Sequence, residues 1–301
     1  MNEFYEQLNR ERENNRWTEW ENHRSEITKL VHLATSHLPH QTSAIILGAG
    51  NCDDLDLISL IENYDNVALA DVDFSAMMDA VRPLEMGMRM KIDLISTDFT
   101  KLDEINFYRN LQDLLDKKAS AEHIVEFLDY CITQLGEIQI LTHYKGTFQV
   151  VISSAVYTQL FYMNALQIFA PYVERYKQKE ITTIMNGLLE LRNVVIQNYN
   201  DLLTDLASPH AVIVVWSDVL KVSPDKSFME TVNSFPTDSG KIQFIMNEVK
   251  RNGRMEGMFG LQDMQNRFAS HGRNFHYWIW PYSSKNHCLT FGISGRIRSL
   301  E

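Results

Sequence analysis

The sequence predicts an α/β protein built on a doubly wound, mostly parallel seven-stranded sheet with a C-terminal antiparallel hairpin. Two observations predict this fold class. From residue 42 onward, short apolar runs of strand length alternate with longer segments of helical periodicity, the pattern of a parallel sheet. Near the end of the chain, two β-rich runs stand only a few residues apart, which favours a hairpin. N-terminal helices and long helical insertions complete the predicted architecture.

Residues 1–40 are expected to form a helical segment, and residues 41–301 a single domain around the sheet. Apolar side chains in the first segment recur at spacings of three, four or seven, which places them on one helix face. These side chains are Trp17, Trp20, Ile27, Val31, Ala34 and Leu38. The stripe predicts packing against a neighbouring sheet or a second subunit.

Two helical insertions are predicted, at about 102–147 and 161–209. The first breaks into two helices at 117–120, where Ser120 is a suitable N-cap, and the second breaks after Pro171. A helix is also expected directly after the first strand, a second at 75–84, and a single one, 241–250, between 223 and 272. The strands are expected at 43–47, 67–70, 92–96, 148–153, 211–216, 275–280 and 287–293.

Composition narrows the classes of function. The 301 residues carry a formal net charge of −11, so no general positive field attracts nucleic acid, and nucleic acid is not expected as a partner. Cys52, Cys131 and Cys288 form no zinc-ligand or disulfide pattern, so no metal site is expected. No apolar stretch approaches the roughly 18 residues that cross a bilayer, and the charged N-terminus lacks a signal-peptide core. We therefore expect a cytoplasmic protein with no membrane partner.

Ligands of an open α/β sheet bind beyond the carboxyl ends of its strands. At the first such end, Gly48-Ala49-Gly50 lets the backbone approach a ligand closely. A dinucleotide-binding GxGxxG would need glycine at position 53, where the chain has Asp53. Asp53 and Asp54 would also repel a pyrophosphate at the expected helix start, although they could simply stabilise that helix end. NAD and nucleoside triphosphates are therefore disfavoured.

An adenosine ligand without phosphates suits the acids that follow the next two strands. Asp71 and Asp73 lie 21 and 23 residues after Gly50, near the interval at which a carboxylate accepts hydrogen bonds from ribose hydroxyls. Asp98 ends the third strand and can accept a hydrogen bond from an exocyclic amine, with Phe99 beside the purine. A single strand-end Asp is a common loop former, but a series at successive strand ends favours a ligand.

These segments resemble the class I S-adenosylmethionine-dependent methyltransferases over roughly residues 43–160. The matching stretches are Leu47-Gly48-Ala49-Gly50-Asn51, Asp73-Phe74-Ser75-Ala76-Met77, Ser96-Thr97-Asp98-Phe99 and the run from Phe148 to Val156. The terminal hairpin also resembles the last two strands of that family. The resemblance implies a Rossmann-like methyltransferase domain over residues 41–301, with S-adenosyl-L-methionine as the cofactor.

The resemblance also implies a role for each motif. The first motif would contact the methionine portion, the second the ribose, the third the adenine, and the fourth would line the methyl-transfer site. The implied cofactor-binding residues are Gly48, Ala49, Gly50, Asn51, Asp73, Phe74, Asp98, Phe99, Ser153 and Ser154.

The chain departs from the family pattern at three positions. Ile46 and Gln149 stand where the family often has an acid, and Cys52 stands where it often has a third glycine. The contact to the methionine ammonium would then come from Asp53, Asp54 or Ser153.

Methyl transfer from a sulfonium is an in-line displacement that needs alignment and a dry cavity rather than a fixed catalytic group. Tyr157 and His143 are the candidate catalytic residues, with Gln159 and Tyr162 as further candidates for orienting an acceptor. The structural alternative for the tyrosines is a half-buried ring with its hydroxyl in water, and for His143 a solvated loop position.

The sequence therefore predicts methyl transfer to a small-molecule or peptide acceptor. The first alternative is a non-catalytic binding or scaffold protein that kept the fold, which the residues at positions 46 and 149 favour. The second is an NAD-linked oxidoreductase, which Asp53 disfavours. The helical insertions suit either a lid over the acceptor or packing, including the interface of a homodimer.

Overall fold

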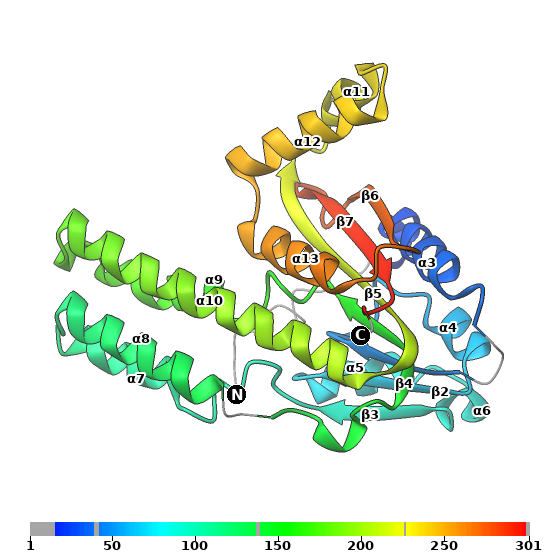
Figure 1. Ribbon diagram of the computed structural model, residues 1–301, viewed down its shortest axis with the longest axis horizontal. Coiled ribbons are helices and arrows are strands. Elements are labelled where there is room, and N and C mark those ends of the chain that lie inside the picture. The colour runs from blue at the N-terminus through cyan, green and yellow to red at the C-terminus, as the bar shows by residue number, and fades with distance from the viewer. Residues whose placement is uncertain (1–15, 39–41, 137–138, 226, 299–301) are drawn as a thin grey trace.

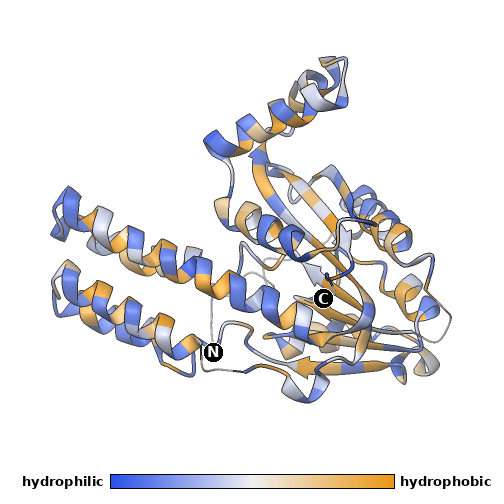
Figure 2. Ribbon diagram, in the orientation of Figure 1, coloured by the Kyte–Doolittle hydropathy of each residue, from blue (hydrophilic) through white to orange (hydrophobic). Residues whose placement is uncertain are grey.

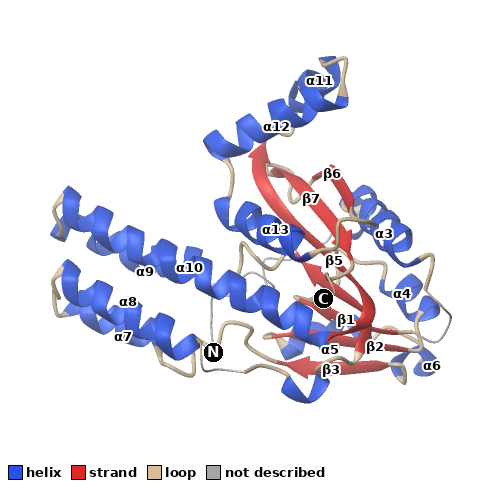
Figure 3. Ribbon diagram, viewed as in Figure 1, coloured by secondary structure: helices blue, strands red, loops and turns tan. Residues whose placement is uncertain are grey.

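The computed structural model describes residues 16–38, 42–136, 139–225 and 227–298. Its centre is one seven-stranded sheet with the order β3-β2-β1-β4-β5-β7-β6 (Figures 1 and 3). The strands are β1 Ser43–Leu47, β2 Asn66–Asp71, β3 Ile92–Ser96, β4 Phe148–Ser154, β5 Ala207–Val222, β6 Asn274–Trp280 and β7 His287–Gly295. The first five pair in parallel, and β7 runs antiparallel to both β5 and β6. The predicted fold class is confirmed.

The central strand β1 shows why the sheet is buried on both faces. Ile45, Ile46 and Leu47 have no exposed surface, and Ile45 lies beside Ala68 of β2 and Val151 of β4. Because side chains alternate between the two faces of a strand, Ile45 and Leu47 enter one apolar core, whereas Ile46 enters the other. A continuous apolar run is what such a strand requires.

Helices cover the two cores. The core that contains Ile46 is covered by helices from the N-terminal half of the chain, and the core that contains Ile45 by the longer helices (Figure 2). The first group is α3 Glu21–Thr35, α4 Leu57–Asn63, α5 Phe74–Val81 and α6 Met86–Arg89, and the short helix α2 Arg16–Glu19 precedes α3 without burying a residue. The second group is α7 Phe107–Asp116, α8 Ala121–Leu135, η1 Thr142–Tyr144, α9 Tyr162–Phe169, η2 Ala170–Arg175, α10 Gln178–Leu206 and α13 Met255–Arg267. α11 Ser227–Ser234 and α12 Asp238–Asn252 extend beyond the end of β5 (Figure 1).

The described part of the N-terminal segment is helical, and the rest of 1–40 lies outside the described residues. Trp20, Ile27, Val31 and Ala34 are buried in the predicted stripe. Trp17 was expected in the same stripe, but it is 60% exposed, and the Arg24 guanidinium lies 3.7 Å from the centroid of its ring. The stripe faces the sheet, where Trp20 contacts the end of the C-terminal hairpin.

The two predicted breaks in the helical insertions are confirmed. Ser120 caps α8, since its hydroxyl accepts a hydrogen bond from the His123 backbone N–H. In the second insertion, Pro171 lies at the start of η2, which separates α9 from α10. Figure 1 shows α7 with α8 and α9 with α10 extending together to one side of the sheet.

Two predictions about the C-terminal half are wrong. β5 extends over 16 residues instead of six, because its outer half pairs with β7. The described residues of 223–272 form three helices rather than one. Among the described residues, no helix is both long and apolar enough to cross a membrane.

Candidate functional site

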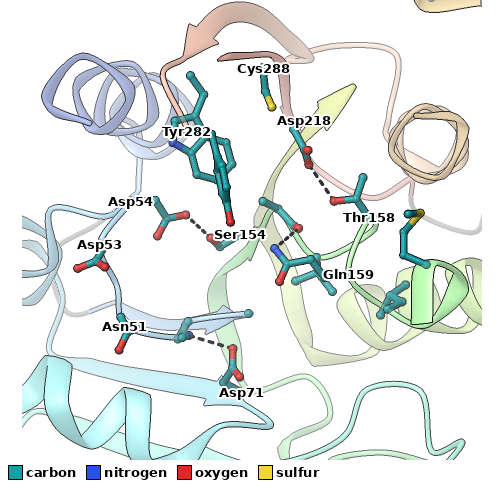
Figure 4. Close-up of a pocket in the computed structure, with 18 of the residues that line it drawn as sticks. Asn51, Asp53, Asp54, Asp71, Ser154, Thr158, Gln159, Asp218, Tyr282 and Cys288 are labelled. Carbon is teal, nitrogen blue, oxygen red and sulfur yellow. Dashed lines mark hydrogen bonds between the residues drawn. The ribbon is translucent and has the colours of Figure 1, made fainter. Parts of the chain in front are cut away.

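A cavity of about 490 Å³ opens at the carboxyl ends of the parallel strands. Its volume lies in the range of sites for small molecules, roughly 300–1,000 Å³. The loops after β1, β2, β3 and β4 all contribute to its wall, as do β5, α13 and the C-terminal hairpin. Figure 4 shows the polar side chains that point into it.

The turn after β1 forms the floor of the cavity. Gly48 and Gly50 both adopt positive φ, at 74° and 47°, and the Gly48 N–H donates a hydrogen bond to the Ala70 carbonyl. The carboxylate of Asp71 accepts a hydrogen bond from the Gly50 N–H at 2.9 Å. Together with Ala49 and Asn51, these glycines line the cavity, so the first predicted motif lies where a ligand would contact it.

The prediction that this turn leads directly into a helix is wrong. The helix α4 begins only at Leu57, and its N-cap is Asp56, whose carboxylate accepts a hydrogen bond from the Ser59 N–H. Asp53 and Asp54 therefore lie in the loop before the helix, where both are buried and both line the cavity. They face the ligand space instead of stabilising a helix end.

The two acids after β2 lie in different environments. Asp71 ends the strand and lines the cavity, and burial raises its pKa. Asp73 is the N-cap of α5, where its side chain accepts a hydrogen bond from the Ala76 N–H, and it does not line the cavity. Phe74, the first residue of α5, is 46% exposed and also lies outside the lining. Of the two acids predicted for the ribose, only Asp71 therefore lines the cavity.

The predicted adenine site follows β3. Asp98, Phe99 and Thr100 line the cavity. One carboxylate oxygen of Asp98 accepts hydrogen bonds from both the backbone N–H and the hydroxyl of Thr100, at 2.8 and 2.7 Å. These bonds fix the loop, and the second carboxylate oxygen of Asp98 accepts no hydrogen bond from a described residue. The ring of Phe99 lies 5.5 Å from that of Tyr199, measured between centroids.

The two serines at the end of β4 point in different directions. The Ser154 hydroxyl lines the cavity and donates a hydrogen bond of 2.5 Å to the carboxylate of Asp54. Burial raises the pKa of Asp54 to about 6. Ser153 is fully buried, pairs with the Tyr199 hydroxyl at 2.8 Å, and does not line the cavity. Ser154 and Asp54 therefore form the polar centre of the cavity (Figure 4).

The N-terminal helices and the C-terminal hairpin supply a wall that sequence reasoning missed. Arg16 and Trp20 line the cavity opposite the strand ends, together with Trp280 and Tyr282. The Arg16 guanidinium lies 4.9 and 5.8 Å from the ring centroids of Trp20 and Tyr282, and 4.0 Å from the carboxylate of Asp53. The apolar stripe of the N-terminal segment predicted packing on a sheet or a second subunit, but no local signal linked that segment to a ligand site.

An ion pair between a buried carboxylate and an exposed guanidinium forms the far side of the cavity. Asp218 of β5 is 5% exposed, accepts a hydrogen bond from the Thr158 hydroxyl at 2.8 Å, and pairs with the Arg254 guanidinium. Burial raises the pKa of Asp218, and the Arg254 charge opposes that shift. Both residues line the cavity, as does Glu256 two residues later.

The structure places the two candidate catalytic residues away from the cavity. Tyr157 is 2% exposed and does not line the cavity, and its hydroxyl donates a hydrogen bond of 2.6 Å to Asn200. His143 lies exposed in η1, before the amino end of β4, whereas the cavity lies at the carboxyl end. Gln159 lines the cavity, whereas Tyr162 is buried at the start of α9 and is not part of the lining.

Replacing Tyr157 by phenylalanine is expected to lower the free energy of unfolding by about 1–3 kcal/mol, because the side-chain amide oxygen of the buried Asn200 loses its donor. Urea unfolding measures this loss. The change is not expected to alter ligand affinity at the cavity, and Tyr130→Phe, at a 55% exposed position, is the control for stability. A Tyr157→Phe variant of unchanged stability but lost ligand binding would contradict this structural role.

Comparisons with known proteins give matches among solved structures alone. No family model and no curated protein matches the chain. An S-adenosylmethionine-dependent methyltransferase from Aquifex aeolicus is 9% identical with a TM-score of 0.42, over 97% of this chain and 96% of that one. The YcgJ protein from Bacillus subtilis is 8% identical with a TM-score of 0.41, over 89% and 97%.

The N-methyltransferase NodS from Bradyrhizobium japonicum, solved with S-adenosyl-L-homocysteine, is 10% identical with a TM-score of 0.40, over 95% and 100%. Such identities and TM-scores are too low to transfer an activity, a ligand or a substrate to this chain.

Proposed function

We propose that this protein binds S-adenosyl-L-methionine in the cavity and transfers its methyl group to an acceptor. One observation carries the proposal. Three successive strand ends present a glycine turn, a buried carboxylate and a second carboxylate to one cavity: Gly48 to Asn51, Asp71 and Asp98. Acceptor oxygens at these places suit the ribose hydroxyls and the adenine amine of an adenosine ligand.

The other side chains of the cavity fit the methionine portion of the ligand. A carboxylate and a hydroxyl, from Asp54 and Ser154, would hold the ammonium group, and the Arg16 guanidinium would hold the carboxylate. Asp71, rather than Asp73, would accept the hydrogen bonds of the ribose hydroxyls. When bound, the cofactor supplies a methyl group on a sulfonium centre, and the cavity aligns it with the acceptor and excludes water.

The carboxylates of the floor also bear on the two alternatives. Asp53 and Asp54 are buried at the place where a dinucleotide would bring its pyrophosphate, so an NAD ligand would meet two negative charges. A non-catalytic role keeps the same pocket and differs only in turnover. Binding and turnover must therefore be measured separately.

The test is isothermal titration calorimetry with S-adenosyl-L-homocysteine between pH 5 and 8. We expect affinity to be constant above the pKa of Asp54, about 6, and to fall below it by up to about tenfold per pH unit. The reason is that protonated Asp54 cannot accept the ammonium, so binding requires loss of that proton. The raised pKa has a second consequence for the free protein, whose free energy of unfolding should decrease as the pH rises from about 4 to about 6.

Two variants and one competing ligand serve as controls. Asp54→Asn should bind more weakly at neutral pH and lose the pH dependence, whereas Asp56→Asn, at the N-cap of α4, should keep it. NADH should show no binding under the same conditions. The proposed function fails if S-adenosyl-L-homocysteine does not bind, or if NADH binds more tightly. Binding without methyl transfer to any acceptor in a cell extract would support the non-catalytic alternative.

A further inference from the structure

The cavity has two sides, and the proposed cofactor uses only one of them. Figure 4 shows Asp54 to the left of Ser154, Asp71 below it, and Thr158 and Asp218 to its right. The second side is completed by Glu256 at the start of α13 and by Arg254. These residues lie beyond the carboxyl end of β4 and beside its neighbour β5. The proposed cofactor leaves this side of the cavity free, so an acceptor would approach the cofactor from there.

Glu256 is the most informative residue of this second side. It is 8% exposed, it lines the cavity, and its carboxylate makes no hydrogen bond or ion pair with any described residue. The stem of Glu256 is buried, and its carboxylate oxygens are accessible from the cavity, so a ligand in the cavity can supply the donor that the protein does not. The first turn of α13 tolerates the negative charge, because the positive end of the helix dipole lies there.

The nearby cations do not neutralise Glu256. The Arg254 guanidinium is paired with Asp218, whose carboxylate also accepts a hydrogen bond from the Thr158 hydroxyl. Lys221 lines the cavity as well, but it is exposed and makes no described ion pair with Glu256. Burial is the main cause of the raised pKa of Tyr162, and the Glu256 charge adds to it, so this carboxylate lies near the phenol of Tyr162. A cationic ligand group would therefore meet Glu256 as its free counter-charge.

We propose that the methyl acceptor is a primary or secondary amine whose nitrogen is held by Glu256. This inference rests on the proposed function and names its substrate class. The Glu256 carboxylate accepts a proton from the bound ammonium, which frees the nitrogen lone pair. A C–N bond then forms to the methyl carbon as the C–S bond breaks, so the sulfonium becomes a neutral thioether and the product is the methylated ammonium.

The experiment compares three probes of equal length, hexylamine, hexanol and hexanoate, by calorimetry at neutral pH, with and without saturating S-adenosyl-L-homocysteine. Hexylamine should bind more tightly than hexanol by about tenfold or more, since a charge-assisted hydrogen bond contributes that much, and hexanoate should not bind. Glu256→Gln should remove the preference for hexylamine, whereas Glu230→Gln, exposed on α11, should keep it.

Each outcome decides one of the two proposals. If hexanol or hexanoate binds as well as hexylamine, or if Glu256→Gln keeps the preference, the amine site is overturned while the cofactor site stands. If hexylamine binds through Glu256 but S-adenosyl-L-homocysteine does not bind at all, the proposed function fails and the amine site stands. An unchanged affinity of Glu256→Gln for S-adenosyl-L-homocysteine, within about twofold, shows that this variant is folded.

Discussion

Replacing Gly48 by alanine is expected to abolish detectable S-adenosyl-L-homocysteine binding and to lower the free energy of unfolding by about 2–5 kcal/mol. Gly48 has a φ of +74°, a conformation that costs other residues energy. A Cβ atom there would also lie 2.4 Å from Cγ2 of Val156 and 2.9 Å from the Ser154 carbonyl oxygen. The turn must therefore move, and with it the floor of the cavity. Urea unfolding and calorimetry measure the two effects.

Gly272→Ala is the matched control for this prediction. Gly272 has nearly the same φ, +76°, but nothing lies within 4 Å of the position of its Cβ. Its replacement should lower the free energy of unfolding by only about 1–2 kcal/mol, the cost of this backbone conformation for alanine, and should leave ligand binding unchanged. Equal losses for the two variants would show that the contact with Val156 and Ser154 is unimportant.

Replacing Asp71 by alanine is expected to weaken S-adenosyl-L-homocysteine binding by about 100-fold, as two charge-assisted hydrogen bonds to the ribose would be lost. The same change leaves the N–H groups of Gly50 and Asp73 without their acceptor, so the free energy of unfolding should fall by about 1–3 kcal/mol for each. Calorimetry and urea unfolding again measure the two effects.

Asp73→Ala separates the two strand-end acids. Because Asp73 caps α5, its removal should cost about 1 kcal/mol of stability and change the affinity less than tenfold. The reverse order of affinities would assign the ribose to Asp73, as the family resemblance implies. Asp71→Asn keeps one acceptor oxygen, so its affinity for S-adenosyl-L-homocysteine should lie between those of Asp71→Ala and the wild type.

The sheet was predictable because its strands carry their own local signal. A continuous apolar run such as Ser43–Leu47 must be covered on both faces, and the alternation with helical patterns then leaves few topologies. The glycine turn and the acids at the next two strand ends were predictable as ligand-site candidates because each directly follows a strand with such a signal. The sequence could not decide between Asp71 and Asp73 as the ribose-binding acid, because both lie near the expected interval after Gly50. Only the structure shows that α5 begins at Phe74, which makes Asp73 its N-cap.

The helix α13 was missed because two glycines lower its helix propensity. The structure explains both. A Cβ at Gly257 would lie 2.7 Å from the Ser217 hydroxyl, and one at Gly260 would lie 2.5 Å from the ring of Tyr157. Glycine is needed there for close packing against β5 and the loop after β4, a requirement that a local pattern cannot reveal. The contributions of Arg16 and Glu256 to the cavity could not be predicted either, because tertiary packing alone brings these residues to the strand ends.

The contact between the first described helices and the C-terminal hairpin has a consequence for the order of folding. The Trp20 indole N–H donates a hydrogen bond to the Tyr282 carbonyl, and the Trp278 indole N–H donates to the His23 ring, across 262 and 255 residues. Contacts of such sequence separation form late, because the long intervening loop must close first. During synthesis the glycine turn can form early, yet the aromatic wall is completed only when the last strands leave the ribosome. Until those strands have been made, the nascent chain exposes Trp20 and its apolar stripe, so this helix is a candidate for chaperone protection.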